Sequence, residues 1–144
     1  MVPFADHATL LQFSRLLVIC RFMKNSEKVI LVIDDDEDFQ TILKVTLNRS
    51  GYCVRSLFDG QIHPTLNDPP LPDVILLDVD LPYANGVEVG RLLKSNESTR
   101  DIPVIMVSAN PYVDELSKEV GAADYVQKPF TLKTLIQKVQ ATLS

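Results

Sequence analysis

From Lys28 onward, short apolar runs alternate with stretches of helical periodicity, and this alternation is the strongest constraint on the fold of the chain. Continuous apolar runs that are rich in β-branched residues are typical of strands buried on both faces. Stretches with apolar residues at helical spacing follow these runs. A repeated strand–helix pattern of this kind favours a parallel sheet with helices on both faces.

The repeat predicts five strands and about five helices. Strands are expected at residues 29–33, 52–57, 74–77, 104–107 and 125–126. Helices are expected through residues 39–47 and ending at Ser50-Gly51, over residues 87–96, from a cap at Asn110 to Gly121, and over residues 132–143. Residues 59–73 are rich in proline, so a helix there must be short, broken or replaced by a loop. The predicted fold is a doubly wound α/β sheet with right-handed crossovers.

Residues 1–27 do not follow the repeat, and we expect them to form an N-terminal extension to a single domain over residues 28–144. Arg15 and Arg21 interrupt their apolar run, which is too short for a membrane span and lacks the pattern of a secretory signal. Two interpretations stay open for the extension. It is an amphipathic helix that docks on the body or on a second subunit, or it arises from an upstream choice of start codon.

Composition excludes several classes of partner. The chain has 19 acidic and 14 basic residues and a formal net charge of -5, without a local basic patch, so neither nucleic acid nor a membrane is expected as a partner. Two cysteines are too few for a disulfide framework, and Cys53 is expected to be a small packing residue. These features favour a cytoplasmic protein.

Polar residues follow four of the predicted strands. They are Asp34-Asp35-Asp36, Asp78-Val79-Asp80, Ser108-Ala109 and Lys128-Pro129. In doubly wound sheets, ligands bind outside the carboxyl ends of the strands. If the aspartates converge there, each ionised pair at about 4 Å costs about 4 kcal/mol at an effective dielectric constant of 20, so a cation must hold them together. Hard oxygen ligands of this kind favour Mg²⁺.

The same strand ends carry the groups that phosphoryl transfer needs. A carboxylate beside Mg²⁺ can attack phosphorus and form an aspartyl phosphate. Lys128 supplies a positive charge and Ser108 a hydroxyl for the phosphoryl oxygens, while the small Ala109 leaves room for the group.

Four segments resemble a known family in their order and spacing. They are ILVIDDD at residues 30–36, PDVILLD at 72–78, VIMVSA at 104–109 and GAADYVQKPF at 121–130. Together they resemble the response-regulator receiver domain of two-component signalling over residues 28–144. The resemblance implies a flavodoxin-like sheet with the strand order 2-1-3-4-5.

The resemblance also implies a role for each site residue. Asp78 is the phosphoacceptor. Asp34, Asp35 and Asp78 are the expected Mg²⁺ ligands, with Asp34 acting mainly through water, and the backbone carbonyl of Asp80 completes the set. Asp80 and Asn110 occupy two variable positions that tune the lifetime of the phosphoryl group.

The resemblance also implies that a second group of residues binds the phosphoryl group and changes conformation when it is present. Ser108, Ala109 and Lys128 bind it, and Ser108 and Tyr125 form a switch pair in which the hydroxyl moves to the phosphoryl group and the ring turns inward. The Lys128–Pro129 peptide bond is expected to be cis.

By the same resemblance, a sensor histidine kinase or a phosphotransfer protein donates the phosphoryl group, and the chain is not an enzyme beyond its own phosphorylation and dephosphorylation. Because the sequence ends just after the last helix, we expect a stand-alone receiver whose output is contact with another protein. The last helix and its neighbours form the dimer face that is usual in the family, which makes a homodimer an expectation.

Two other functions stay open from the residues. Asp78-Val79-Asp80 also resembles the Asp-x-Asp start of haloacid-dehalogenase-type phosphatases, although Leu81-Pro82 is a poor match to their context. Turnover of p-nitrophenyl phosphate would favour that interpretation. A receiver-like interaction module that is never phosphorylated is the other, and failure to label with acetyl phosphate would favour it.

Overall fold

The computed structural model describes residues 27–59, 69–82 and 84–144. Its sheet has five parallel strands in the order β2-β1-β3-β4-β5, which confirms the predicted fold class and strand order. The elements, in chain order, are β1 (Val29–Ile33), α2 (Glu37–Arg49), β2 (Cys53–Leu57), β3 (Val74–Asp78), α3 (Gly86–Ser95), β4 (Val104–Ser108), α4 (Val113–Val120), β5 (Asp124–Gln127) and α5 (Leu132–Leu143).

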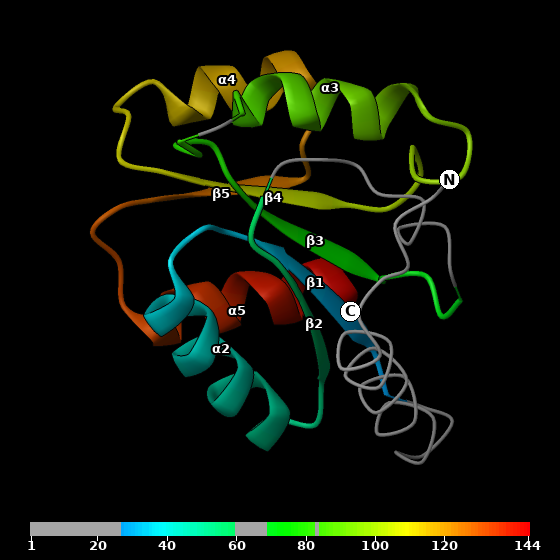
Figure 1. Ribbon diagram of the computed structural model, residues 1–144, viewed down its shortest axis with the longest axis vertical. Coiled ribbons are helices and arrows are strands. Elements are labelled where there is room, and N and C mark those ends of the chain that lie inside the picture. The colour runs from blue at the N-terminus through cyan, green and yellow to red at the C-terminus, as the bar shows by residue number, and fades with distance from the viewer. Residues whose placement is uncertain (1–26, 60–68, 83) are drawn as a thin grey trace, which may run out of the picture.

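Helices cover both faces of the sheet (Figure 1). Helices α2 and α5 lie on one face, and α3 and α4 lie on the other. Every residue of β1, β3 and β4 is buried, as the continuous apolar runs of these strands predict. The sheet is therefore sandwiched between two helical layers, and its strand ends are the places where polar side chains can reach solvent.

Alternation along the strands divides the apolar core into two clusters. Leu31, Ile75 and Met106 face α3 and α4 and pack with Leu93 and Val120. Their neighbours along each strand face the opposite way and pack against α2 and α5, with Ile30, Ile105, Leu43, Leu47, Leu135 and Val139 in the second cluster. Burial of each such side chain contributes about 1.5–3 kcal/mol.

Most helix ends follow their local sequence. Asp36 caps α2 by accepting a hydrogen bond from Phe39 N, and acidic residues fill the first turn, as the sequence predicts for Asp36-Glu37-Asp38. The start of α4 differs from the prediction. Asn110 Oδ1 accepts from Tyr112 N at 2.9 Å, which makes a local turn, and the helix begins only at Val113. Gly121, with φ 81°, ends α4 as predicted.

Cys53 departs from expectation. It is buried in β2, as expected of a small packing residue, but it is disulfide-bonded, and no disulfide was expected from the sequence. Disulfide formation depends on how close two Cα atoms come in the folded chain, and the position of a cysteine along the sequence does not determine this distance.

Two other predictions fall largely outside the described residues. The segment expected to hold a short or broken helix lies mostly within residues 60–68, and the N-terminal extension lies within residues 1–26. The boundary of the domain at residue 28 therefore stays a prediction. In the ranges that are described, none of the helices combines the length and the apolar character that a membrane crossing requires.

Candidate functional site

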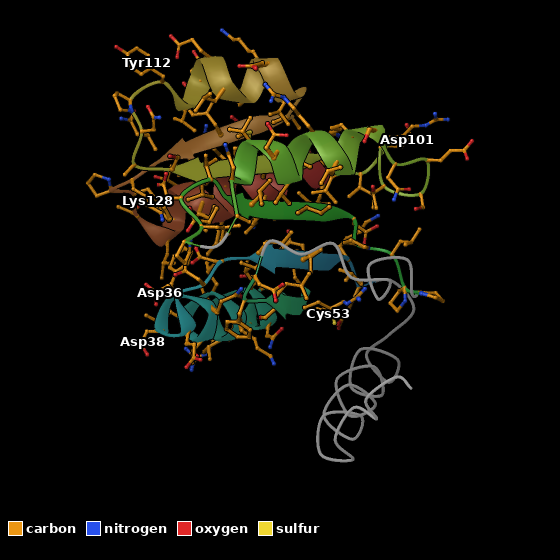
Figure 2. All side chains as sticks on the ribbon, turned by 45° about the horizontal axis from the view of Figure 1, so that its top comes forward. Asp36, Asp38, Cys53, Asp101, Tyr112 and Lys128 are labelled. Carbon is orange, nitrogen blue, oxygen red and sulfur yellow. The ribbon has the colours of Figure 1, made fainter. Side chains whose placement is uncertain are left out.

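The parallel register of the strands brings their carboxyl ends to one end of the molecule. Ile33 of β1 pairs with Leu77 of β3, so the residues that follow, Asp34 and Asp78, are neighbours. Figure 2 shows Asp36, Asp38 and Lys128 at this end, whereas Cys53 and Asp101 lie at the other. The residues that follow the strands in the sequence thus lie together at the carboxyl-terminal end of the sheet.

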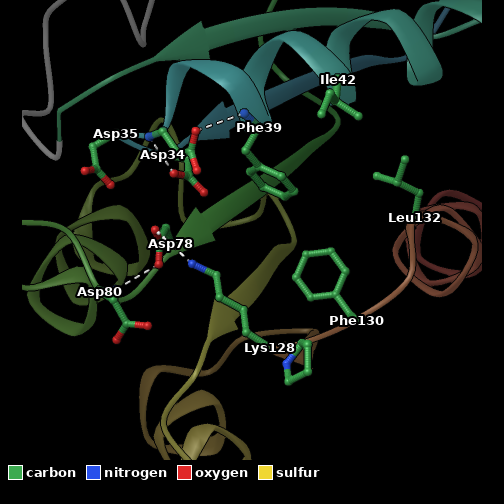
Figure 3. Close-up of a pocket in the computed structure, with 11 residues that line it drawn as sticks. Asp34, Asp35, Phe39, Ile42, Asp78, Asp80, Lys128, Phe130 and Leu132 are labelled. Carbon is green, nitrogen blue, oxygen red and sulfur yellow. Dashed lines mark hydrogen bonds and ion pairs between the residues drawn. The ribbon is translucent and has the colours of Figure 1, made fainter.

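Three of these residues form a carboxylate cluster. Asp34, Asp35 and Asp78 each offer an oxygen, and these oxygens lie within 4.8 Å of one another. Asp34 and Asp78 are buried, each with 3% of its surface exposed, while Asp35 is exposed. Figure 3 shows the three side chains converging on one space. An arrangement of this kind is electrostatically unfavourable unless a positive charge lies among the oxygens.

Burial and the neighbouring carboxylates both change the pKa of Asp34. Burial raises the pKa of its carboxyl group from 3.8 to about 6, and the nearby charges of Asp78 and Asp35 raise it as well. A hydrogen bond from the backbone of Asp36 and the charge of Lys128 act in the opposite direction. Three hard oxygen donors with an excess of negative charge fit a divalent cation such as Mg²⁺.

Gln40 holds the backbone beside Asp34, and the sequence analysis missed it. Its amide Nε2 donates to the carbonyl oxygens of Val32, Asp34 and Leu57, at 3.0, 3.2 and 3.0 Å. These bonds join α2 to the ends of β1 and β2. The available signal was a glutamine at helical spacing from Leu43, because a polar residue in a buried stripe needs internal partners.

Both oxygens of Asp78 accept hydrogen bonds. Oδ1 accepts from the backbone N–H of Asp80 at 2.9 Å, and Oδ2 lies 3.4 Å from Lys128 Nζ. Figure 3 shows Lys128 extending from the end of β5 towards this carboxylate. The Lys128–Pro129 peptide bond is cis. A buried carboxylate thus faces an ammonium group on one side and two further carboxylates on the other.

Ser108 and Ala109 both contact the carboxylate of Asp80. Ser108 Oγ lies 3.1 Å from each carboxylate oxygen of Asp80, and the N–H of Ala109 donates to Asp80 Oδ2 at 3.0 Å. Asn110 N donates to Ser108 Oγ at 3.0 Å. The donors expected to bind a phosphoryl group are therefore engaged by Asp80, which was assigned from the sequence only a backbone ligand and a lifetime role.

Tyr125 lies half-buried against the core cluster that faces α3 and α4. Lys138 of α5 holds the backbone of β5 here, because its Nζ donates to the carbonyl of Tyr125 at 2.6 Å and to Asp124 Oδ1 at 2.9 Å. The same Nζ lies 4.8 Å from the centre of the Tyr125 ring. Sequence analysis did not identify Lys138.

Gly86 allows the loop after β3 to close tightly. A Cβ atom at this position would lie 2.4 Å from Val79 Cα and 2.6 Å from the carbonyl oxygen of Asp78. The N–H of Gly86 donates to the carbonyl of Val79 at 3.2 Å. The first residue of α3 therefore packs directly on the backbone that carries Asp78, and any side chain here would displace it.

The carboxylates open onto a pocket of about 630 Å³. Its other wall is apolar and is formed by Phe39, Ile42, Phe130 and Leu132, from α2 and from the region where α5 begins. The rings of Phe39 and Phe130 meet edge to face, with centres 5.9 Å apart. The carboxylates thus lie beside an apolar surface in the same pocket.

Comparisons with known proteins agree with this geometry. Residues 30–140 match the family model of the response regulator receiver domain. The phosphate regulon transcriptional regulatory protein PhoB of Pseudomonas aeruginosa is 40% identical over 119 residues, covering 81% of this chain and 52% of that protein. The DNA-binding dual master transcriptional regulator RpaA of Synechocystis is 35% identical over 116 residues, with coverages of 79% and 48%. The chain spans about half the length of these curated relatives.

A solved structure supports the same assignment. The chemotaxis protein CheY4 of Vibrio cholerae superimposes with a TM-score of 0.74 at 26% identity, over 82% of this chain and 100% of that chain. It shares the fold, and the family model covers the four segments on which the resemblance depends. We conclude that the chain belongs to the response regulator receiver domain family of two-component systems.

Proposed function

We propose that Asp78 accepts a phosphoryl group in a Mg²⁺-dependent reaction and that phosphorylation changes the contacts of the chain with other proteins. The observation that carries the proposal is the environment of Asp78, which is buried, 3.4 Å from Lys128 Nζ and clustered with Asp34 and Asp35. Phosphorylation is typical of receiver domains, and they generally bind Mg²⁺.

The ligands proposed for Mg²⁺ are the side chains of Asp34, Asp35 and Asp78 and the backbone carbonyl of Asp80. Their oxygens are the hard donors that this cation prefers. Burial, with a smaller contribution from the charges of Asp78 and Asp35, raises the pKa of Asp34, which supports a site that favours a cation. When bound, Mg²⁺ would neutralise charge on the carboxylates and on the phosphoryl oxygens.

Asp78 acts as the nucleophile in this proposal. A carboxylate oxygen attacks the phosphorus of a phosphohistidine, the P–N bond breaks, and its electron pair returns to the imidazole. Lys128 balances charge on the carboxylate and then on the transferred group. Loss of the phosphoryl group by hydrolysis follows when water attacks phosphorus and the P–O bond to Asp78 breaks.

Phosphorylation also provides a switch. Ser108 Oγ and the N–H of Ala109 lie at the end of the strand next to β3, where their donors can turn to the phosphoryl oxygens. Tyr125, on the neighbouring strand, would follow the movement of Ser108. Asp80 and Asn110 both hydrogen bond to Ser108, which supports a role for them in setting how long the phosphorylated state lasts.

The proposed phosphodonor is a sensor histidine kinase or a phosphotransfer protein, the usual partners of receiver domains. The apolar wall formed by Phe39, Ile42, Phe130 and Leu132 lies beside the carboxylates and gives such a protein a surface to contact while its histidine reaches Asp78. We propose that a downstream protein reads the switch, that a homodimer can form, and that residues 28–144 carry these functions without turnover of an external substrate.

Cytoplasmic location is part of the proposal, because ATP-dependent phosphodonors work there. A disulfide is uncommon in a reducing compartment, so the redox state of Cys53 in cells tests this point. Rapid alkylation of cell lysates followed by mass spectrometry would reveal it. A reduced, alkylated Cys53 supports the cytoplasm, and a fully oxidised Cys53 contradicts it.

The central test is labelling with acetyl phosphate. With Mg²⁺, the intact mass should increase by one phosphoryl group, and Asp78→Asn should abolish the increase. Asp38→Asn is the matched control, because Asp38 is an exposed carboxylate at the same end of the molecule. An unlabelled native protein would favour a receiver-like interaction module instead. Multiple turnover of p-nitrophenyl phosphate would favour a phosphatase, which the family match does not support.

A further inference from the structure

The carboxylate of Asp80 engages the donors at the end of β4. Ser108 Oγ is 3.1 Å from both of its oxygens, and Ala109 N is 3.0 Å from Oδ2. The backbone N–H of Asp80 donates to Asp78 Oδ1 at 2.9 Å, so Asp80 also touches the proposed phosphoacceptor. Figure 3 shows the side chain of Asp80 directed away from the cluster of Asp34 and Asp35.

These contacts use both donor groups, the Ser108 hydroxyl and the Ala109 N–H. A serine hydroxyl has one proton to donate, and Ser108 Oγ already accepts from Asn110 N. That proton is therefore directed at Asp80, and so is the single N–H of Ala109. Both bonds are charge-assisted, because their acceptor is a carboxylate. Ser108 is fully buried and has no water to offer its proton to.

Among residues 27–59, 69–82 and 84–144, no lysine or arginine forms an ion pair with the Asp80 carboxylate, and Lys128 reaches Asp78 instead. The Ser108 hydroxyl and the Ala109 N–H are the groups that hold the Asp80 side chain in place. The carboxylate presents two negatively charged oxygens to these donors, and a phosphoryl group would present oxygens of the same sign to them.

We propose that Asp80 is an internal competitor of the phosphoryl group: its carboxylate occupies Ser108 and Ala109 in the unphosphorylated protein and holds the switch in its resting state. The inference rests on the proposed function of Asp78. Phosphorylation has to break both contacts of Asp80, and the negative charge placed on Asp78 repels the Asp80 carboxylate while attracting the donors. The negative charge on phosphorylated Asp78 thus both attracts Ser108 and Ala109 and displaces the Asp80 carboxylate that holds them.

The competition has a measurable consequence. Because a ligand that needs Ser108 and Ala109 must displace Asp80, the native protein binds it more weakly than a variant without the carboxylate. Beryllofluoride, which mimics a phosphoryl group on aspartate, is the probe. At saturating Mg²⁺, Asp80→Ala should bind it about tenfold more tightly than the native chain. Asp80→Asn, which keeps one acceptor oxygen but loses the charge, should lie between the two.

Removal of a nearby negative charge alone would also favour an anion, so two controls are needed. Asp38→Ala removes one exposed charge at the same end of the molecule and should change the affinity by less than about twofold, because exposed charges are strongly screened. In a Ser108→Ala background, the gain from Asp80→Ala should shrink by about threefold or more, because one of the two contacts is already absent. An equal gain in both backgrounds would show a charge effect without competition and would overturn the proposal.

A second readout does not depend on phosphoryl chemistry. In the metal-free protein, the amide proton of Ala109 should move upfield in the NMR spectrum and exchange faster in Asp80→Ala, since its charged acceptor is gone. An unchanged Ala109 amide would contradict the contact itself. Native protein that fails to bind beryllofluoride with Mg²⁺ would instead refute the proposed function, whereas equal binding by native protein and Asp80→Ala would refute only the competition.

Discussion

Lys128 Nζ lies 3.4 Å from Asp78 Oδ2 and connects the end of β5 to the end of β3, although 50 positions separate the two residues in the chain. Asp78 has 3% of its side chain exposed, whereas Lys128 has 34%. The carboxylate is thus fixed in the sheet, while the ammonium group lies on a longer, partly solvated side chain that can follow a moving charge.

Lys128→Ala should separate phosphorylation from switching. Removal of a positive charge beside the carboxylates should leave Mg²⁺ affinity equal or higher, while the phosphoryl group loses a cation that would hold it. We expect labelling of Asp78 with a much smaller response of the Ser108 and Tyr125 resonances to beryllofluoride. Lys128→Arg is the matched control, because it keeps the charge. A full response in the alanine variant would contradict this role.

Asp78→Asn should abolish labelling and also stabilise the metal-free protein. The substitution removes one of three carboxylates whose oxygens lie within 4.8 Å of one another, so the repulsion within the cluster falls. We expect the free energy of unfolding without Mg²⁺ to rise by about 1–3 kcal/mol in denaturant titrations at neutral pH and low salt. Asp38→Asn should have little effect. A destabilised Asp78→Asn variant would show that the carboxylate contributes more through its hydrogen bonds.

Protonation of Asp34 should raise the free energy of unfolding of the metal-free protein as the pH is lowered from 7 to 4. Its pKa is raised to about 6 in the folded state from 3.8. Between these values the folded chain holds a proton that the unfolded chain lacks, so lowering the pH favours folding, and the gain is complete below about 3.8. Asp34→Asn should remove this dependence. Unfolding curves of the native protein and of Asp34→Asn, measured at several pH values with a chelator present, would isolate the contribution of Asp34.

Gln40→Leu should destabilise the protein by about 2 kcal/mol or more, because the carbonyl oxygens of Val32, Asp34 and Leu57 lose a shared donor in a buried site. Leucine has a similar volume, so loss of packing contributes little. Gln137→Leu on exposed α5 surface is the control and should change the free energy of unfolding by less than about 0.5 kcal/mol. Equal effects of the two substitutions would contradict the role of Gln40.

Gly86→Ala should destabilise the protein by about 2 kcal/mol or more and should also slow labelling. The added Cβ would meet the backbone of Asp78 and Val79 at distances that atoms do not adopt, so the loop after β3 has to move. The exposed Glu88→Ala on the same helix is the control for helix stability. Native stability and labelling in Gly86→Ala would show that α3 can shift without disturbing Asp78.

The strands of the sheet could be predicted because each one is recognisable from a few consecutive residues. The runs at residues 29–33, 74–77 and 104–107 are apolar throughout, and short runs of this kind are typical of strands buried on both faces. Helix ends at Asp36 and Gly121 could be predicted because caps act over a few residues. The predicted start of α4 was two residues too early, since Asn110 bonds to the next backbone groups as readily as it caps a helix.

Which chemical groups stand at the strand ends follows from the order of residues alone, because a residue that follows a buried strand in a parallel sheet must lie at one edge. How those groups pair depends on the folded arrangement: Lys128 with Asp78, Gln40 with three carbonyls, and Asp80 with Ser108 and Ala109. These contacts join separate strands and helices, and their distances depend on side-chain rotamers and loop paths that no local pattern encodes. Periodicity therefore predicts the edge at which a side chain lies, whereas packing determines which neighbour it contacts.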